Sequence, residues 1–175
     1  EFRRVLFRSH WAALAGFSEI IELLLSRGGK VDVRDNGGFT PLHAAAYQTR
    51  MEAARLLIAA GADVTVRSKT GWSPLHKSFE RAASFDAAIR FDAVAIAAFA
   101  DLLLAHGADI NGGTAAGDTP IFFAAVAGHR GLAEHLIARG AEVNVVNTAG
   151  VTPLHLAIVG SRAEVAELLL DRGAN

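Results

Sequence analysis

Histidines are the residues of this chain that could bind a metal or carry protons, and there are seven of them. Imidazole is a common metal ligand and titrates near neutral pH. His10, His43 and His76 recur at intervals of 33 residues, and His155 belongs to the same series. Each is therefore expected in a different structural unit, too far from the others to share a metal. The remaining three lack H-E-x-x-H or similar ligand spacing. The sequence thus predicts neither a metal site nor a catalytic histidine.

Other signatures of catalysis or cofactor binding are absent from the sequence. Gly29-Lys30 lacks the upstream glycine of a phosphate-binding loop, because Leu24 occupies that position. A partial calcium-loop pattern begins at Asp32 but lacks the ligand spacing and the terminal Glu. There is no cysteine, which excludes disulfides and thiolate zinc sites. We therefore expect no cofactor, no metal and no enzymatic activity.

A recurring tetrapeptide organises the chain. Its four copies are Thr40-Pro41-Leu42-His43, Ser73-Pro74-Leu75-His76, Thr119-Pro120-Ile121-Phe122 and Thr152-Pro153-Leu154-His155. Their first residues are separated by 33, 46 and 33 residues, and a period in this range is typical of stacked-repeat proteins. Thr or Ser can cap a helix with its hydroxyl, and Pro at the first helical position loses no needed N–H. Each copy therefore predicts the start of a helix.

A glycine follows each helix start at a fixed distance. Gly61, Gly140 and Gly173 come 21 residues after their Thr, and Gly107 has the same role after a longer interval. Glycine suits the left-handed conformation that ends many helices. Between start and stop there is room for two short helices, and a turn-forming stretch leads to the next copy. The predicted unit is a helix pair followed by a loop.

These residues resemble the ankyrin repeat, with its T-P-L-H-x-A signature, from His10 to Asn175. The resemblance implies an all-α-type repeat solenoid of about five helix-turn-helix units joined by β-hairpin loops. It also implies that the motif histidines are structural and bind the backbone of neighbouring hairpins. The expected repeats are 10–30, 40–63, 73–109, 119–142 and 152–175.

Repeats three and four depart from the regular pattern. Repeat three has 13 extra residues, placed at about 82–94, and their Ala-rich composition without Gly or Pro predicts helix. This insertion is either a tolerated helix extension or an extra partner-contact surface. Repeat four has Phe122 for the motif His and His135 for a usual Leu, which predicts a locally weaker unit. In repeat one, Ile20, Leu23 and Leu24 are expected to form the apolar stripe.

Residues 1–9 do not belong to the repeat pattern, which begins at His10. They match the in-frame translation of the end of a common short-read sequencing adapter. Our hypothesis is that the reading frame comes from assembled metagenomic DNA, and that residues 1–9 are disordered. The alternative is a basic N-terminal arm for nucleic acid or targeting. Because the chain also stops within a repeat at Asn175, we interpret it as an internal fragment of a longer protein.

The charge balance favours a protein partner. The formal net charge is −1, which argues against nucleic acid or an anionic membrane as the partner. No apolar run is long enough to span a membrane. We expect the full-length parent protein to be monomeric. The compartment is not fixed by the sequence, and the cytoplasm is favoured.

The resemblance implies a concave partner surface formed by hairpin tips and first helices. Trp, Tyr and Arg are frequent binding hot spots. The predicted contact residues are Arg34, Asn36, Phe39, Tyr47, Arg67, Lys69, Trp72, Glu80 and Arg81. The leading hypothesis is a protein–protein interaction module. The alternatives are a substrate-positioning segment of a larger enzyme or effector, and a structural scaffold or spacer.

Overall fold

The computed structural model describes residues 2–83 and 92–175, with side chains from Arg8 onward. This part of the chain contains ten α-helices, arranged in sequence as five pairs. The pairs are α1 (Phe2–Ala15) and α2 (Ser18–Ser26), α3 (Pro41–Tyr47) and α4 (Met51–Ala59), α5 (Pro74–Phe79) and α6 (Ala93–Ala105), α7 (Pro120–Ala127) and α8 (Arg130–Ala138), and α9 (Pro153–Val159) and α10 (Ala163–Asp171). The predicted repeat solenoid is confirmed.

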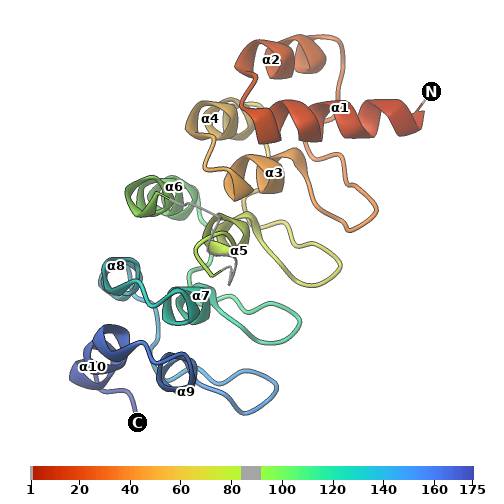
Figure 1. The fold of residues 1–175 in the computed structure, drawn as a ribbon. Helices are drawn as coiled ribbons and strands as arrows, with labels where there is room; N and C mark the ends of the chain where they lie inside the picture. Colours follow the sequence, from red (N-terminus) through yellow and green to blue (C-terminus); the bar gives the residue numbers. More distant parts are fainter. Residues whose placement is uncertain (1, 84–91) are drawn as a thin grey trace.

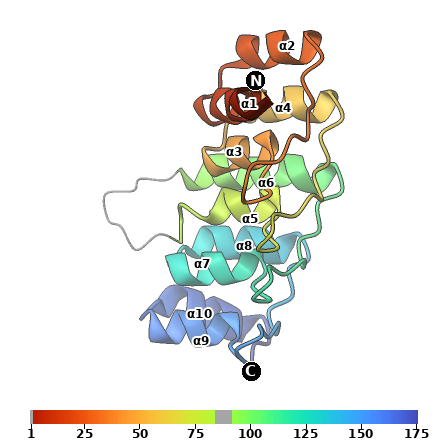
Figure 2. The same ribbon diagram turned by 90° about the vertical axis from the view of Figure 1, so that its right-hand side faces the viewer.

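The five helix pairs stack into two columns (Figure 1). The first helices, α1, α3, α5, α7 and α9, form the column beside the connecting loops, and the second helices form the outer column (Figures 1 and 2). All the loops project to the same side of the stack. The loops and the first helices therefore share one long face, on which loop residues and helix residues can act together.

Each Thr/Ser-Pro motif begins a helix, as predicted. In repeats two, three and five, the backbone N–H of the capping residue donates to the motif histidine Nδ1 over 3.1–3.2 Å. The capping hydroxyl also lies 2.7–3.0 Å from the same nitrogen. The imidazole thus takes the part that Glu or Gln plays in a capping box. Because Nδ1 accepts, the proton of the neutral ring lies on Nε2.

The same histidines join one repeat to the next. His10 Nε2 lies 2.9 Å from the Phe39 carbonyl oxygen, and His43 Nε2 lies 2.9 Å from that of Trp72. The expectation that the motif histidines bind neighbouring backbone is therefore confirmed for His10, His43 and His76. His43 and His76 each hold their own helix start with Nδ1 and the following loop with Nε2.

The connecting loops are reverse turns, and no β-strand occurs in residues 2–83 or 92–175, where hairpins were expected. Each loop is closed by a backbone bond such as that from Ser68 N to the Trp72 carbonyl, 2.8 Å. One further bond joins each loop to the next, as from Ala115 N to the Thr70 carbonyl, 2.9 Å. A single bond between neighbours fixes their register but is too little for a strand ladder.

Apolar side chains between the two columns form a continuous core. The first helices pack through alanines such as Ala45 and Ala125, which are fully buried and allow a close approach. In repeat one the buried residue of α2 is Ile21, whereas Ile20 and Leu23 of the expected stripe are exposed. The reason is geometric, because α2 has a neighbouring second helix, α4, on one side only. No helix in the described residues is long and apolar enough to cross a membrane.

The insertion in repeat three is described only at its two ends. Helix α6 has 13 residues, whereas α2, α4, α8 and α10 have nine each, and its extra turn lies at its start. The Asp92 carboxylate caps this helix by accepting from Val94 N (2.9 Å) and Ala95 N (3.1 Å). Residues 84–91 lie outside the described residues, so the helix expected there stays a prediction.

Helix α1 begins at Phe2, whereas residues 1–9 were expected to be disordered. These residues contain no Gly or Pro, so nothing interrupts the helix on the N-terminal side of His10. From His10 onward α1 matches the other first helices, with Ala12 and Ala13 buried against the neighbouring repeat.

Repeat four shows the structural consequence of losing the motif histidine. Phe122 fills the position with a buried ring, and the Thr119 hydroxyl is left buried with no hydrogen-bond partner among the described residues. His135 is better accommodated than expected. Its Nε2 lies 2.8 Å from Asp101 Oδ1, and Arg139 donates to the other carboxylate oxygen over 2.8 Å. The unsatisfied polar group of this repeat thus lies at the cap, not at His135, and the lower stability of the repeat stays a prediction.

Asparagine side chains bridge the repeats next to the glycine stops. Asn111 Nδ2 donates to the Gly140 carbonyl over 3.1 Å, and its Oδ1 accepts from Glu142 N over 2.9 Å. Asp32 occupies the equivalent position after repeat one, next to the Gly28 stop. One of its oxygens accepts from Asp63 N over 3.0 Å, but the other is buried with no partner among the described residues. A carboxylate cannot donate to the carbonyl that the asparagine amide would reach.

The variant Asp32→Asn is expected to raise the free energy of unfolding by about 1 kcal/mol, the usual net contribution of one hydrogen bond. Its new amide group would donate to the carbonyl of Gly61. This glycine follows residue 32 by 29 residues, the same interval that separates Gly140 from Asn111. Urea denaturation checks this. The matched control Asn111→Asp should lose a similar amount, and a neutral or destabilising Asp32→Asn would contradict the bridge.

Candidate interaction surface

The predicted contact residues all come from two loops and the ends of two first helices. Arg34, Asn36 and Phe39 lie in the loop before α3, and Tyr47 ends α3. The next loop and the end of α5 provide the others, namely Arg67, Lys69, Trp72, Glu80 and Arg81. The structure places these residues on the shared face of loops and first helices but gives them different roles.

The aromatic members gather around a lysine that was not among the predicted residues. Lys77 Nζ lies 4.7 Å from the ring centre of Phe39, 5.1 Å from that of Tyr47 and 5.4 Å from that of Trp72. Glu80, three residues further along, pairs with the same ammonium group. We call Lys77, Phe39, Tyr47 and Trp72 the Lys77 cluster. Cation–π contacts contribute about 0.5–2 kcal/mol each, so the cluster holds side chains of two repeats in fixed positions.

Two further contacts, one at each end of the Lys77 cluster, extend the aromatic surface along the face. The Trp72 ring meets Phe123 of repeat four edge-on, with 5.1 Å between ring centres. The Arg81 guanidinium lies 5.5 Å from the centre of the Tyr47 ring. Aromatic and Arg side chains are the commonest hot spots of protein interfaces. The face therefore carries a run of such residues from repeat two to repeat four.

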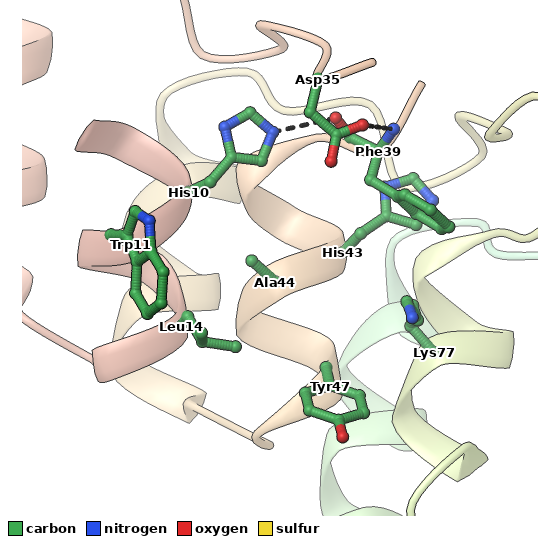
Figure 3. Close-up of a pocket in the computed structure, with 9 residues that line it drawn as sticks. All are labelled: His10, Trp11, Leu14, Asp35, Phe39, His43, Ala44, Tyr47 and Lys77. Atoms are coloured by element: carbon green, nitrogen blue, oxygen red, sulfur yellow. Dashed lines mark hydrogen bonds between the residues drawn. The ribbon is translucent and has the colours of Figure 1, made fainter. Parts of the chain in front are cut away.

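A pocket of about 270 Å³ opens beside the Lys77 cluster (Figure 3). It lies against α1, α3, α5 and the loop before α3, and we call it the aromatic pocket. Its lining residues are His10, Trp11, Leu14, Asp35, Phe39, His43, Ala44, Tyr47 and Lys77. The side chain of Trp11 is 64% exposed, although it belongs to a structured helix. The wall is mostly apolar, with Lys77 and Asp35 as its charged members.

One repeat position supplies several of these side chains, and the sequence prediction missed it. The residue directly after the motif histidine position is Trp11, Ala44, Lys77, Phe123 or Leu156 in the five repeats. Three of the five line the pocket and a fourth packs on Trp72. A position that varies between Trp, Lys and Phe within an otherwise regular repeat was the signal available in the sequence.

Arg67 and Arg34 hold the loops together. Arg67 donates to the carbonyl of Gly113 over 2.6 Å and to that of Gly71 over 3.1 Å. A Cβ at Gly112 would lie only 2.3 Å from this guanidinium, so a larger residue there would displace the Arg67 side chain. Arg34 donates to the Arg67 carbonyl over 2.9 Å. Removing the Arg67 side chain would therefore disturb two loops as well as any partner contact, whereas the bond from Arg34 to the Arg67 backbone carbonyl would remain.

The buried motif histidines are held in the neutral form. Burial lowers the pKa of His43 to about 4, and the positive charges of Lys77 and Arg34 act in the same direction. Burial likewise lowers the pKa of His76 to about 4, with a contribution from Arg67. No group of three or more His, Asp or Glu side chains suited to a metal occurs in the described part of the chain. These rings can donate and accept hydrogen bonds, and near neutral pH they carry no charge.

The family model for ankyrin repeats (3 copies) matches residues 9–95 and 87–175. This is an ankyrin-repeat protein. The ten helices of residues 2–83 and 92–175, which form five pairs, and the Thr/Ser-Pro-x-His helix starts agree with that assignment. Ankyrin repeats in general are protein–protein interaction modules, and the family is typically non-enzymatic. The resemblance predicted from the sequence is confirmed.

Two curated relatives of this ankyrin-repeat protein are the protein phosphatase 1 regulatory subunit 12A of Mus musculus and that of Rattus norvegicus. Each is 46% identical over 44 residues, which are 25% of this chain and 4% of the relative. The chain therefore matches a small part of these much longer proteins. The matched segment is between one and two repeats long.

Proposed function

We propose that this ankyrin array binds a protein partner through the face shared by the loops and the first helices, with the aromatic pocket as its anchor point. The observation that supports this most is the position of Trp11, a large apolar side chain held 64% exposed at the rim of a preformed pocket. Exposed aromatic residues around a pocket are typical of protein interaction sites.

The predicted contact residues enter this proposal with different weights. Phe39, Tyr47 and Trp72 form the aromatic surface, and Arg81 extends it. Asn36 and Lys69 are exposed in the loops and can contact a partner that spans both. Arg34 and Arg67 act mainly through the loops that they hold.

The test is selection of a random-peptide display library on the immobilised chain, followed by affinity measurement for the selected peptides. We expect the variants Trp11→Ala and Tyr47→Ala to weaken binding at least tenfold, about 1.4 kcal/mol, with the melting temperature recorded for each. The matched control is Leu170→Ala, which removes a comparably exposed apolar side chain (55%) from α10 in the outer column.

Two outcomes contradict the proposal. In the first, the selected peptides lose affinity for Leu170→Ala and keep it for the other two variants, which would place the binding face on the outer column. In the second, selection enriches no peptide at all, as expected for a structural spacer.

A further inference from the structure

We propose that the aromatic pocket takes one bulky apolar side chain of a partner segment that carries an acidic residue next to it, and that Lys77 sets this acidic preference. The inference rests on the proposed function and specifies the chemistry of the partner. It follows from the pocket's size, from the charge of its rim and from the place that Lys77 already occupies.

The size of the pocket suits a single side chain. A cavity of about 150 Å³ accommodates benzene, so the 270 Å³ of the aromatic pocket is enough for one aromatic or large aliphatic group with part of its backbone. The walls offered to that group are apolar, from Trp11 and Leu14 on α1 to Phe39 and Tyr47 across the pocket. A polar side chain would lose hydration there without gaining comparable partners.

Lys77 excludes a partner cation from the aromatic rings. Its ammonium group lies within 5.4 Å of three ring centres, which are the faces that would otherwise attract Lys or Arg of a partner. A second cation brought to the same place would meet like-charge repulsion. The rings are thus already in contact with a cation of the chain itself, which Glu80 pairs with and which is one of the two charged residues of the pocket wall.

The pocket wall together with the two loops next to it carries more positive than negative charges. The acidic residues are engaged locally, because Glu80 pairs with Lys77 and Asp35 Oδ1 accepts from Gly37 N (2.8 Å) and Phe39 N (2.9 Å). On the positive side, Arg34 and Lys69 are exposed in the loops. An Asp or Glu beside the anchoring side chain would therefore be attracted, and a Lys or Arg repelled.

The experiment compares two acetylated and amidated peptides, Gly-Glu-Phe-Asp-Gly and Gly-Lys-Phe-Lys-Gly, in titrations of the ¹⁵N-labelled chain. The chain has two tryptophans, so the indole N–H signals of Trp11 and Trp72 report on the pocket and on the Lys77 cluster separately. The acidic peptide is expected to shift the Trp11 signal with at least tenfold higher affinity than the basic one. Added salt should reduce the difference.

Lys77 variants identify the source of the preference. Lys77→Gln is expected to bring the two affinities within about threefold of each other, Lys77→Arg to keep the acidic preference, and Lys77→Glu to favour the basic peptide. The matched control is Lys30→Gln, which removes an exposed lysine before the first loop and should keep the tenfold ratio. Thermal melts of each variant show that the fold is retained.

Several results would overturn the inference. Equal affinities for the two peptides in the unmodified chain would disprove the acidic preference, while leaving binding by this face intact. A tenfold ratio that persists in Lys77→Gln would assign it to other residues. If neither peptide shifts an indole signal, the pocket is not the anchor, and the display selection then decides independently whether the face binds protein.

Discussion

Replacing His76 with alanine is expected to lower the free energy of unfolding by about 3 kcal/mol. Its ring is fully buried, with Nδ1 accepting from Ser73 N (3.2 Å) and Nε2 placed 3.1 Å from the Asp118 carbonyl oxygen. Alanine would leave the buried Ser73 N–H without this acceptor and open a cavity of ring size. Both losses occur where the helix start of repeat three meets the loop of repeat four.

The position of this contact in the array adds to its effect. In a stacked-repeat protein each repeat is stabilised mainly by its two neighbours. When one interface is weakened, the repeats before it and the repeats after it can therefore unfold in separate transitions. We therefore expect urea denaturation of His76→Ala to show a lower midpoint together with a smaller apparent m-value.

The matched control for this variant is His106→Ala. His106 is an exposed histidine whose Nδ1 lies 2.8 Å from the Leu102 carbonyl oxygen within its own helix end. Its removal should change the free energy of unfolding by less than about 0.5 kcal/mol. A loss below about 1 kcal/mol for His76→Ala would contradict the role of the ring as a tie between repeats.

The helix starts and the histidine contacts could be predicted from the sequence because they depend on few residues. A Thr or Ser, a Pro and a His at the fourth position form a local cap that needs no information from the rest of the chain. The helix stops at Gly61, Gly107, Gly140 and Gly173 are equally local, and all four glycines have a positive φ of 83–94°. The repeat period then places these local elements at equivalent points of the stack.

The Lys77 cluster could not be predicted, because its members come from two loops and two helices. Neither the residue type nor the spacing of Lys77 says that its ammonium group lies among the rings of Phe39, Tyr47 and Trp72. That arrangement depends on how far repeat three is rotated against repeat two. The role of Arg67 could not be predicted either. Its side chain donates to the Gly113 carbonyl, which follows the insertion in the sequence, and this hydrogen bond joins two loops.

A single departure from the motif was visible in the sequence, but its consequence was not. Phe122 was recognised as a departure from the motif histidine, but repeat four was expected to be weaker because of His135 in its apolar stripe. The structure shows that the missing histidine leaves the buried Thr119 hydroxyl without a partner among the described residues. It also shows that a phenyl ring fits the position of the motif imidazole, with Phe122 2% exposed.

Lowering the pH from about 7.5 to about 5 is expected to reduce the free energy of unfolding by about 4 kcal/mol, with about 2 kcal/mol each from His43 and His76. Burial lowers the pKa of both rings to about 4, against an ordinary value of 6.5. The unfolded chain therefore binds more protons than the folded chain between these values. The stabilising contribution is complete above pH 6.5, decreases as the pH falls, and stops decreasing below about pH 4.

The variants His43→Phe and His76→Phe test this assignment, because Phe122 occupies the same position in repeat four. Each variant loses hydrogen bonds and starts from a lower stability, but each should also remove about half of the pH dependence. Urea denaturation at constant ionic strength from about pH 7.5 to about pH 5 measures the slope. This range avoids Asp63, whose carboxylate has its pKa lowered below 3.8 by hydrogen bonds from Thr65 and so affects stability only at lower pH. An unchanged slope in both variants would assign the acid sensitivity to other groups.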